Sequence, residues 1–198
     1  MNQDGGLTRE GLLLQLKDRF DNIQSYQCNM SLKSFKEGHQ LQNQVLWYRR
    51  AGYIRIEQKG PFRKGAVVVI HPDGNIRGHL GGWLSVLTVT LKPDDPRLLG
   101  VTGDSALTAD YGSIIKSALE DSQKVKRYKI SKDFIEGRPI VILESFVEEE
   151  ISLYRMIIDA EDMLIVQIER YKGDKLISAV SWKDIQINIK LSDELFKL

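Results

Sequence analysis

The sequence predicts an α+β protein in which a curved antiparallel sheet of about ten strands carries two helices over its concave side. Two segments place apolar residues at helical spacing, whereas most of the remaining chain alternates apolar and polar residues with a period of two. The turns that link the segments after residue 123 are so short that neighbouring strands must run antiparallel. Several strands are apolar at both parities, so both of their faces need cover.

The chain is expected to form a single domain over residues 1–198. A length of 198 residues is typical of one domain. No segment rich in proline and serine separates two parts of the chain. Hydrophobic residues make up 42% of the sequence, which is enough for a core and argues against intrinsic disorder.

The first helix is predicted over residues 8–22. Thr8 stands where its side chain can cap the first turn. One face of this helix is apolar, as expected for a helix that packs on a sheet. The residues on that face are Leu7, Leu12, Leu13, Leu16 and Phe20.

The second helix is predicted over residues 105–121, where alanine, isoleucine and leucine form a wide apolar face. Either Asp104 or Ser105 is expected to cap its first turn. Gly112 falls in the middle of this segment, where it should cost about 1 kcal/mol relative to alanine.

The remaining segments are predicted to be strands. Residues 83–93 are apolar at both parities and fit either a strand or a short helix, and residues 94–105 are predicted to be a loop. The predicted strands span residues 25–35, 41–50, 53–60, 64–71, 75–82, 124–131, 138–147, 150–159, 163–172 and 176–189.

The middle strands are unusual because they are apolar on both faces. Residues 140–143 read Ile-Val-Ile-Leu, residues 164–166 read Leu-Ile-Val, and the strand at 150–159 is also apolar at both parities. Two helices of this length can cover only part of ten strands. The pattern therefore fits a partly filled apolar cavity on the concave side, but it fits a fully packed core equally well.

Charge and cysteine content exclude several classes of function. The 28 basic and 27 acidic residues give a net charge of +1, which provides no basic track for nucleic acid. Cys28 is the only cysteine, so the chain has neither an intramolecular disulfide nor a cysteine-based zinc site. Cys28 is expected to be a small buried hydrophobe, and Trp47, Trp83 and Trp182 are expected to be packing residues.

We expect no enzymatic activity, metal or cofactor. The three histidines are His39, His71 and His79, and they lack the spacing of a metal site. Neither a phosphate-binding loop nor a G-x-S-x-G motif is found. The acidic run at residues 148–150 is expected to be a solvated turn. The sequence thus offers no nucleophile, base and oxyanion donor together.

The N-terminus leaves the cellular compartment open. The opening residues lack the basic start and the continuous apolar stretch of a signal peptide. An exported protein whose leader has been removed would look the same. No run reaches the roughly 18 apolar residues of a membrane-spanning helix.

Three stretches resemble the LolA-like superfamily of bacterial periplasmic lipoprotein carriers. Residues 42–78, QNQVLWYRRAGYIRIEQKGPFRKGAVVVIHPDGNIRG, show a strand ending in Leu-Trp, a basic pair, a second strand, a proline and a strand leading to an Asp-Gly turn. Residues 163–196 resemble the end of the same superfamily. Residues 16–32, LKDRFDNIQSYQCNMSL, are similar to its first helix and strand. The resemblance covers nearly the whole chain and is closest to uncharacterised members.

This resemblance implies an unclosed β-barrel of about ten or eleven strands, with helices as a lid over an apolar cavity. It implies a periplasmic carrier that sequesters the acyl chains of lipids or lipoproteins and takes part in lipoprotein sorting to the outer membrane. The expected partners are a lipid or acylated lipoprotein and a membrane-anchored donor or acceptor protein, with the carrier itself a monomer. The alternative is an envelope sensor or interaction module similar to RseB, without carrier activity.

The candidate site consists of apolar residues on the predicted strands and on the lid helix at 105–121, beside which the first helix would lie. Arg50 matches the arginine that holds the lid of LolA by bonding to backbone carbonyls, and a guanidinium offers five donors for that task. Arg49 is a second candidate for this latch, and Ala51 replaces the proline that follows the arginine in LolA. The predicted lining residues are Met30, Leu32, Trp47, Ile54, Val67, Val69, Leu107, Ile115, Leu119, Ile142 and Met156.

Overall fold

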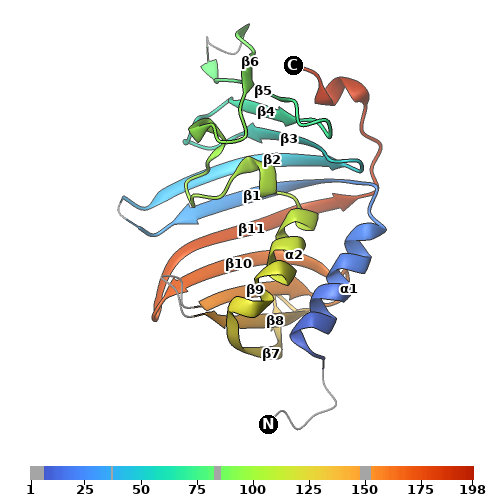
Figure 1. Ribbon diagram of the computed structural model, residues 1–198, viewed down its shortest axis with the longest axis vertical. Coiled ribbons are helices and arrows are strands. Elements are labelled where there is room, and N and C mark those ends of the chain that lie inside the picture. The colour runs from blue at the N-terminus through green and yellow to red at the C-terminus, as the bar shows by residue number, and fades with distance from the viewer. Residues whose placement is uncertain (1–6, 37, 83–85, 148–152) are drawn as a thin grey trace. The chain divides into compact units, whose positions relative to one another are not determined.

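The computed structural model describes residues 7–36, 38–82, 86–147 and 153–198 (Figure 1). Within these residues, eleven strands form one antiparallel sheet in the order β6-β5-β4-β3-β2-β1-β11-β10-β9-β8-β7. The order begins at β6 and ends at β7, so the sheet is not closed into a barrel. The predicted unclosed sheet of about ten or eleven strands with helices on one face is confirmed.

The helices and strands have the following bounds. The α-helices are α1 (Arg9–Asp21) and α2 (Tyr111–Glu120), and the 3-10 helices are η2 (Pro96–Leu98), η3 (Ala106–Thr108), η4 (Asp121–Lys124) and η5 (Asp193–Phe196). The strands are β1 (Ser25–Ser34), β2 (Gln40–Arg49), β3 (Tyr53–Gln58), β4 (Val67–Ile70), β5 (Ile76–His79), β6 (Val89–Leu91), β7 (Val125–Ile135), β8 (Arg138–Val147), β9 (Leu153–Asp159), β10 (Leu164–Lys172) and β11 (Lys175–Ile187).

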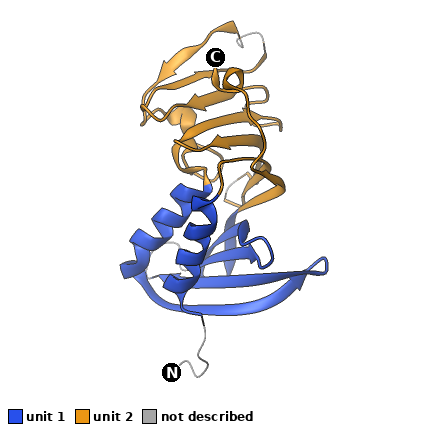
Figure 2. Ribbon diagram, turned by 90° about the vertical axis from the view of Figure 1, so that its right-hand side faces the viewer, with its two compact units in different colours: residues 1–22, 111–179 blue, residues 23–110, 180–198 orange. Residues whose placement is uncertain are grey.

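The chain divides into two compact units (Figure 2). Unit 1 comprises Met1–Asn22 and Tyr111–Ala179, and it contains both α-helices and strands β7 to β10. Unit 2 comprises Ile23–Asp110 and Val180–Leu198, and it contains strands β1 to β6. Each unit is described by itself below.

Helix α1 forms as the sequence predicts. The Thr8 side chain accepts a hydrogen bond from the backbone N–H of Gly11, which satisfies one of the free donors of the first turn. The leucines at helical spacing, Leu12, Leu13 and Leu16, are buried. The middle of the predicted apolar face therefore packs in unit 1, whereas Leu7 before the helix is exposed and Phe20 is partly buried.

The second predicted helix is shorter than expected and is split in two. Residues 105–121 form the 3-10 turn η3, capped by the side chain of Ser105, and the separate helix α2. Gly112 consequently lies in the first turn of α2 rather than in its middle. The cost of about 1 kcal/mol predicted for glycine refers to a helix interior, so it does not carry over to this terminal position.

The strand predictions hold for most of the described chain. The hairpin between β7 and β8 turns at Glu136 and Gly137, whose φ angles of +50° and +81° fit a tight primed turn. The ambiguous segment at 83–93 contributes strand β6, although residues 83–85 lie outside the described residues, as do Trp83 and the acidic run at 148–150. Cys28 is buried as expected, and burial raises the pKa of its thiol.

Replacing Thr8 by alanine should remove the cap of α1 and lower the free energy of unfolding by about 1 kcal/mol. Thr8→Ser keeps the hydroxyl, so its free energy of unfolding should be close to that of the parent protein. Urea denaturation monitored by circular dichroism measures the free energy of unfolding of both variants. Equal midpoints for the alanine and serine variants would contradict the role given to this side chain.

Candidate functional site

The register of unit 2 determines which predicted lining residues share a face. Met30 lies opposite Gln44, and Ile54 lies opposite Tyr48. Because side chains directly opposite each other point to the same side of a sheet, Met30, Leu32 and Ile54 share one face, here called the Met30 face. Its buried apolar members are Tyr26, Cys28, Met30, Leu32, Leu46, Tyr48, Ile54, Ile56, Ile70, Ile76 and Leu91.

Three predicted lining residues lie on the other side of the same strands. Trp47 is opposite Gln27 on β1, and its indole N–H donates to the Gln27 side chain at 2.7 Å. Val67 and Val69 also lie on this side, here called the Trp47 face. They cannot share a cavity with Met30, because the sheet itself stands between them. The run Val67–Val69 is apolar at both parities, so its sequence carries no signal for the correct face.

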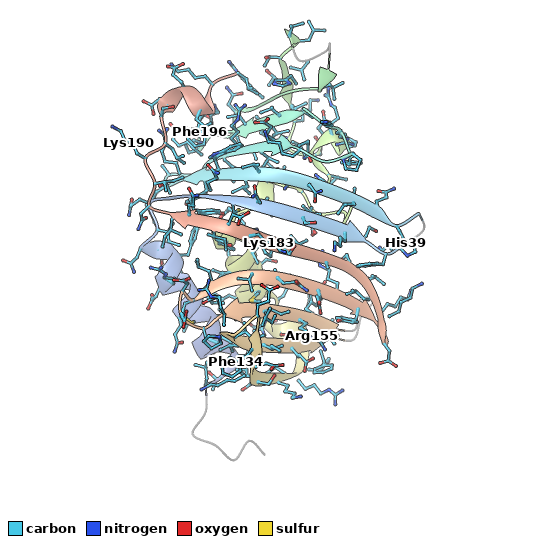
Figure 3. The ribbon with its side chains drawn as sticks, turned by 180° about the vertical axis from the view of Figure 1, so that it is seen from behind. His39, Phe134, Arg155, Lys183, Lys190 and Phe196 are labelled. Atoms are coloured by element: carbon cyan, nitrogen blue, oxygen red, sulfur yellow. The ribbon has the colours of Figure 1, made fainter. Side chains whose placement is uncertain are left out.

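The chain's C-terminal segment covers the Trp47 face. Phe196, on η5, is buried against Val67 and Val69 (Figure 3). The Arg49 guanidinium lies 4.4 Å from the centre of the Tyr53 ring and 4.8 Å from that of Phe196. The segment therefore occupies the space that a ligand would need on this side. Trp47, Tyr53, Leu191, Leu195 and Leu198 complete the packing.

In unit 1, the contacts of Arg9 identify the face that the helices cover. Arg9 lies at the start of α1, and its Nε donates to Ser145 Oγ on β8 at 3.3 Å. Ser145 and Leu143 share that face, and Leu143 lies opposite Met156 on β9. Met156 is therefore on the same face as Ser145, which Arg9 contacts. Ile142 has the opposite parity and faces away from the helices, which removes it from the proposed lining.

The lid candidates divide between the two units. Ile115 and Leu119 lie on α2, where Ile115 is buried and Leu119 is partly buried. Leu107 lies on η3, which belongs to unit 2, because the predicted helix is split. The three residues are therefore not on one continuous helix.

Three arginines, Arg50, Arg49 and Arg9, bond to backbone or side-chain oxygens near the helices or the C-terminal segment. Arg50 Nε donates to the carbonyl of Ile23, just after the end of α1, at 3.1 Å. Arg49 pairs with Asp193 of the C-terminal segment. Arg9 donates to the α2 carbonyl of Ala118 at 2.6 Å, and burial lowers its pKa.

The spacing of residues in the first helix indicates that Arg9 lies on its apolar face. Residues 9, 12, 13 and 16 have the spacing of one helix face, which places an arginine within the leucine stripe. A buried guanidinium needs hydrogen-bond acceptors. Arg9 finds them in Ser145, Ala118 and the Ser122 hydroxyl, the last at 3.0 Å.

Three glutamines form a hydrogen-bonded cluster on the Met30 face. Gln42 and Gln44 are only 3% and 5% exposed. Gln42 Nε2 donates to Gln44 Oε1 at 2.8 Å and to Gln58 Oε1 at 3.1 Å. Gln44 Nε2 donates to the Met30 sulfur at 3.5 Å, and a thioether is a weak acceptor. A polar donor is thus placed within an otherwise apolar surface.

A long loop, residues 92–110, crosses the Met30 face between β6 and α2. Its Val101 N–H donates to Gln42 Oε1 at 2.9 Å. A Cβ added to Gly100 would lie 3.2 Å from a Leu32 methyl group, so the backbone passes close to the sheet. Leu98 of the loop is buried. Residues 94–105 of this covering loop were predicted as a loop, whereas residues 106–110 were predicted as the start of the second helix.

Unit 1 also carries a charged network on the face opposite the helices. Arg155 donates to Glu144 at 2.8 Å, to Glu169 at 3.2 Å and to the Tyr171 hydroxyl at 2.9 Å (Figure 3). Burial and Glu169 raise the pKa of Tyr171 to about 12. Because Arg155 pairs with both carboxylates and Lys129 lies 4.0 Å from Glu144, the network fits a structural role better than acid–base chemistry.

Two searches of the described part of the chain bear on other functions. There, no group of three or more histidine, cysteine, aspartate or glutamate residues is placed to hold a metal ion. Among the same residues, we find no helix with the length and hydropathy needed to cross a membrane.

Replacing Arg9 by methionine should destabilise unit 1, because the acceptors at Ser145 and Ala118 lose their partner. The expected cost is about 1–3 kcal/mol. Arg19→Met serves as the matched control, since Arg19 is on the same helix but its contact with the Asp162 carbonyl is exposed. Chemical denaturation measures the free energy of unfolding of the two variants. A loss no larger for Arg9 than for Arg19 would contradict the anchoring role.

Comparison with known proteins supports the fold. No protein-family model and no curated protein matches the sequence. The chain is similar to an uncharacterised conserved protein from Thermus thermophilus, with a TM-score of 0.60, 10% identity and 93% of each chain covered. It is also similar to a LolA superfamily protein from Nitrosomonas europaea, with a TM-score of 0.46, 11% identity and 98% and 99% of the two chains covered.

A DUF1329 family protein from Desulfovibrio piger gives a TM-score of 0.46 at 15% identity, with 94% of each chain covered. At such identities the likeness concerns the fold alone. The observed architecture, an unclosed antiparallel sheet with helices on one face, is the one implied by the sequence resemblance. The chain is similar in fold to the Thermus thermophilus protein.

Proposed function

We propose that the protein binds the acyl chain of a lipid or acylated lipoprotein on the Met30 face, beneath the covering loop, and acts as a carrier. The single observation behind this proposal is the composition of that face. Its buried apolar residues run across strands β1 to β6, and the covering loop lies over part of it without an α-helix in the described residues of unit 2. A loop can move aside more readily than a packed helix.

The hydrophobic effect supplies enough free energy for such a function. Each buried CH₂ group contributes about 0.8 kcal/mol, so a chain of about sixteen carbons is worth about 12 kcal/mol before costs. A carrier must also release its load. Displacing and reordering the covering loop would offset a large part of the gain, which keeps binding reversible.

The glutamine cluster supplies a polar contact that a bare hydrocarbon would not need. Gln44 Nε2 has the Met30 sulfur as its acceptor, and the carbonyl of an ester or amide would be a stronger one. The linkage between an acyl chain and its glycerol or protein carries such a carbonyl. Gln44 is thus proposed to orient the linkage, with the chain extending along the apolar residues.

The cellular setting belongs to the same proposal. A carrier of acyl chains is needed where lipids or lipoproteins cross an aqueous space, and the LolA-like fold suits the bacterial periplasm. Its partners would be the acylated cargo and a membrane-anchored donor or acceptor. Retention of a protein partner without any acyl binding would instead favour the alternative of an envelope sensor.

Filling the Met30 face should block binding. Met30→Trp is expected to weaken the uptake of a fluorescent fatty-acid probe about tenfold or more, because the larger side chain takes the space of several methylene groups. Leu41→Trp is the matched control, since Leu41 is exposed and lies opposite Lys33 on the same strand pair. Probe displacement by palmitate gives the affinities. Equal affinities for both variants would argue against this site.

The glutamine contact makes a separate prediction about selectivity. Gln44→Met should weaken the binding of a monoacylglycerol about fivefold to tenfold, which corresponds to the loss of one hydrogen bond of about 1–1.5 kcal/mol. The affinity for an alkane of the same length should stay unchanged. Calorimetric titration with the two ligands measures the difference. A parallel loss for both ligands would show that Gln44 acts through folding alone.

A further inference from the structure

We propose that the end of unit 2 formed by β5, β6 and the adjoining loops docks on the surface of an anionic lipid bilayer. This surface, the basic apolar edge, combines exposed aliphatic side chains with cationic ones. It gives the proposed carrier a place to exchange its cargo, and in that respect it rests on the proposed function. Its members are Leu80, Val86, Leu87, Val89 and Leu99, together with Arg63, Lys64, Lys92 and Arg97.

The apolar part of the edge is unusually exposed. Val86 is 82% and Leu87 58% exposed, and Leu80 and Val89 are exposed close by in the sequence. Single exposed apolar residues are normal on protein surfaces, whereas a group of them marks an interaction site. Four within ten residues of sequence form such a group.

Hydrogen bonds bring a second segment to the same edge. Arg63 donates to the carbonyl of Arg97 at 2.6 Å and to that of Leu99 at 3.5 Å. Leu99 is also exposed. Arg63 and Arg97 line a hollow of about 30 Å³ together with Leu80 and Val89. Cationic and aliphatic side chains therefore border the same small depression.

The hollow also joins the edge to the face proposed to bind acyl chains. Val89 lies opposite Gly78, and Gly78 lies opposite Val68. Val68 lies opposite Ile56, which belongs to the Met30 face. These strand positions therefore form a row on one side of the sheet, from the middle of the Met30 face to the edge. An acyl chain could follow this row from a bilayer without crossing the sheet.

The positive charge of the edge favours a membrane that contains anionic lipids. Residues 59–66 and 75–99 contain six basic and two acidic residues, although the whole chain is nearly neutral. Asp95 and Arg97 form an ion pair that adds no net charge, so Arg63, Lys64 and Lys92 carry the positive charge of the edge. Clustered lysine and arginine beside aliphatic groups are attracted to anionic lipid headgroups while the aliphatic groups enter the interface.

The composition favours a bilayer over a protein partner. Protein interfaces are enriched in tyrosine, tryptophan and other aromatic residues. Among the described residues of the edge, the exposed apolar side chains are leucine and valine, and the neighbouring Phe62 is partly buried, with its ring centre 4.7 Å from the Arg63 guanidinium. A second exposed apolar pair provides an internal comparison. Phe134 and Ile135 lie at the β7–β8 turn (Figure 3), between the acidic residues Asp133 and Glu136. Arg138 lies opposite Ile135, but it is paired with Asp159 and Asp162.

The experiment is co-sedimentation of the full chain with vesicles of phosphatidylglycerol and phosphatidylcholine. The parent protein should bind these vesicles and should bind pure phosphatidylcholine at least about tenfold more weakly. Val86→Glu combined with Leu87→Glu should weaken binding about tenfold or more. The matched control, Phe134→Glu combined with Ile135→Glu, adds the same charge at a site of similar exposure and should bind like the parent.

The cationic residues are tested separately. Lys64→Gln combined with Lys92→Gln should weaken binding to the anionic vesicles roughly fivefold for each charge, and high salt should do the same to the parent. The substituted positions are exposed, and circular dichroism confirms that each variant is folded.

Two results would overturn the proposal: no binding of the parent to anionic vesicles at low salt, or equal binding of the two double-glutamate variants. Uptake of a fatty-acid probe in the absence of vesicles separates this proposal from the proposed function. The Val86 and Leu87 variant should keep parent-like uptake. Vesicle binding without any probe uptake would leave the docking surface standing while the carrier function fails.

Discussion

The alternation of side chains across each strand decides how every other part of this molecule must be placed. Since neighbouring residues point to opposite sides, a strand that is apolar at both parities creates two faces that need cover. In unit 2 the C-terminal segment covers the Trp47 face through Phe196, and the loop at 92–110 crosses the Met30 face. The two covers differ in kind, because aromatic and cation–π contacts hold the first, whereas hydrogen bonds from Val101 to Gln42 and from Arg63 to loop carbonyls hold the second.

Most helices and strands and the fold could be predicted from the sequence, but the side of the sheet that each residue faces could not. Helix α1 and its Thr8 cap follow from local spacing and propensity, as do the strands with clear alternation. The assignment of Trp47 and Val67 to the lining was wrong because face depends on register, and consecutive valines do not encode it. Arg9 shows a different limit, since its position in the leucine stripe was visible while its partners Ala118 and Ser145 are distant in sequence.

The Met30 face combines features that suit reversible binding of a chain-like ligand. Its apolar surface provides affinity, Gln44 provides a donor for a carbonyl, and the covering loop provides a part that can move. Gly100 permits the close approach of the loop, where a larger residue would press on Leu32 and Gln42. The exposed leucine and valine residues at the β5–β6 end continue the same parity outward, so that loading from a bilayer and storage could use one continuous surface.

Whether an acyl chain lies on the Met30 face can be measured by nuclear Overhauser effects from a ¹³C-labelled palmitoyl chain to the protein's methyl groups. We predict contacts with Met30, Leu32 and Ile54 and with methyl groups of the covering loop. Saturating ligand that yields no contacts to these residues, or contacts only to Val67 and Val69 on the opposite face, would contradict the proposed binding site.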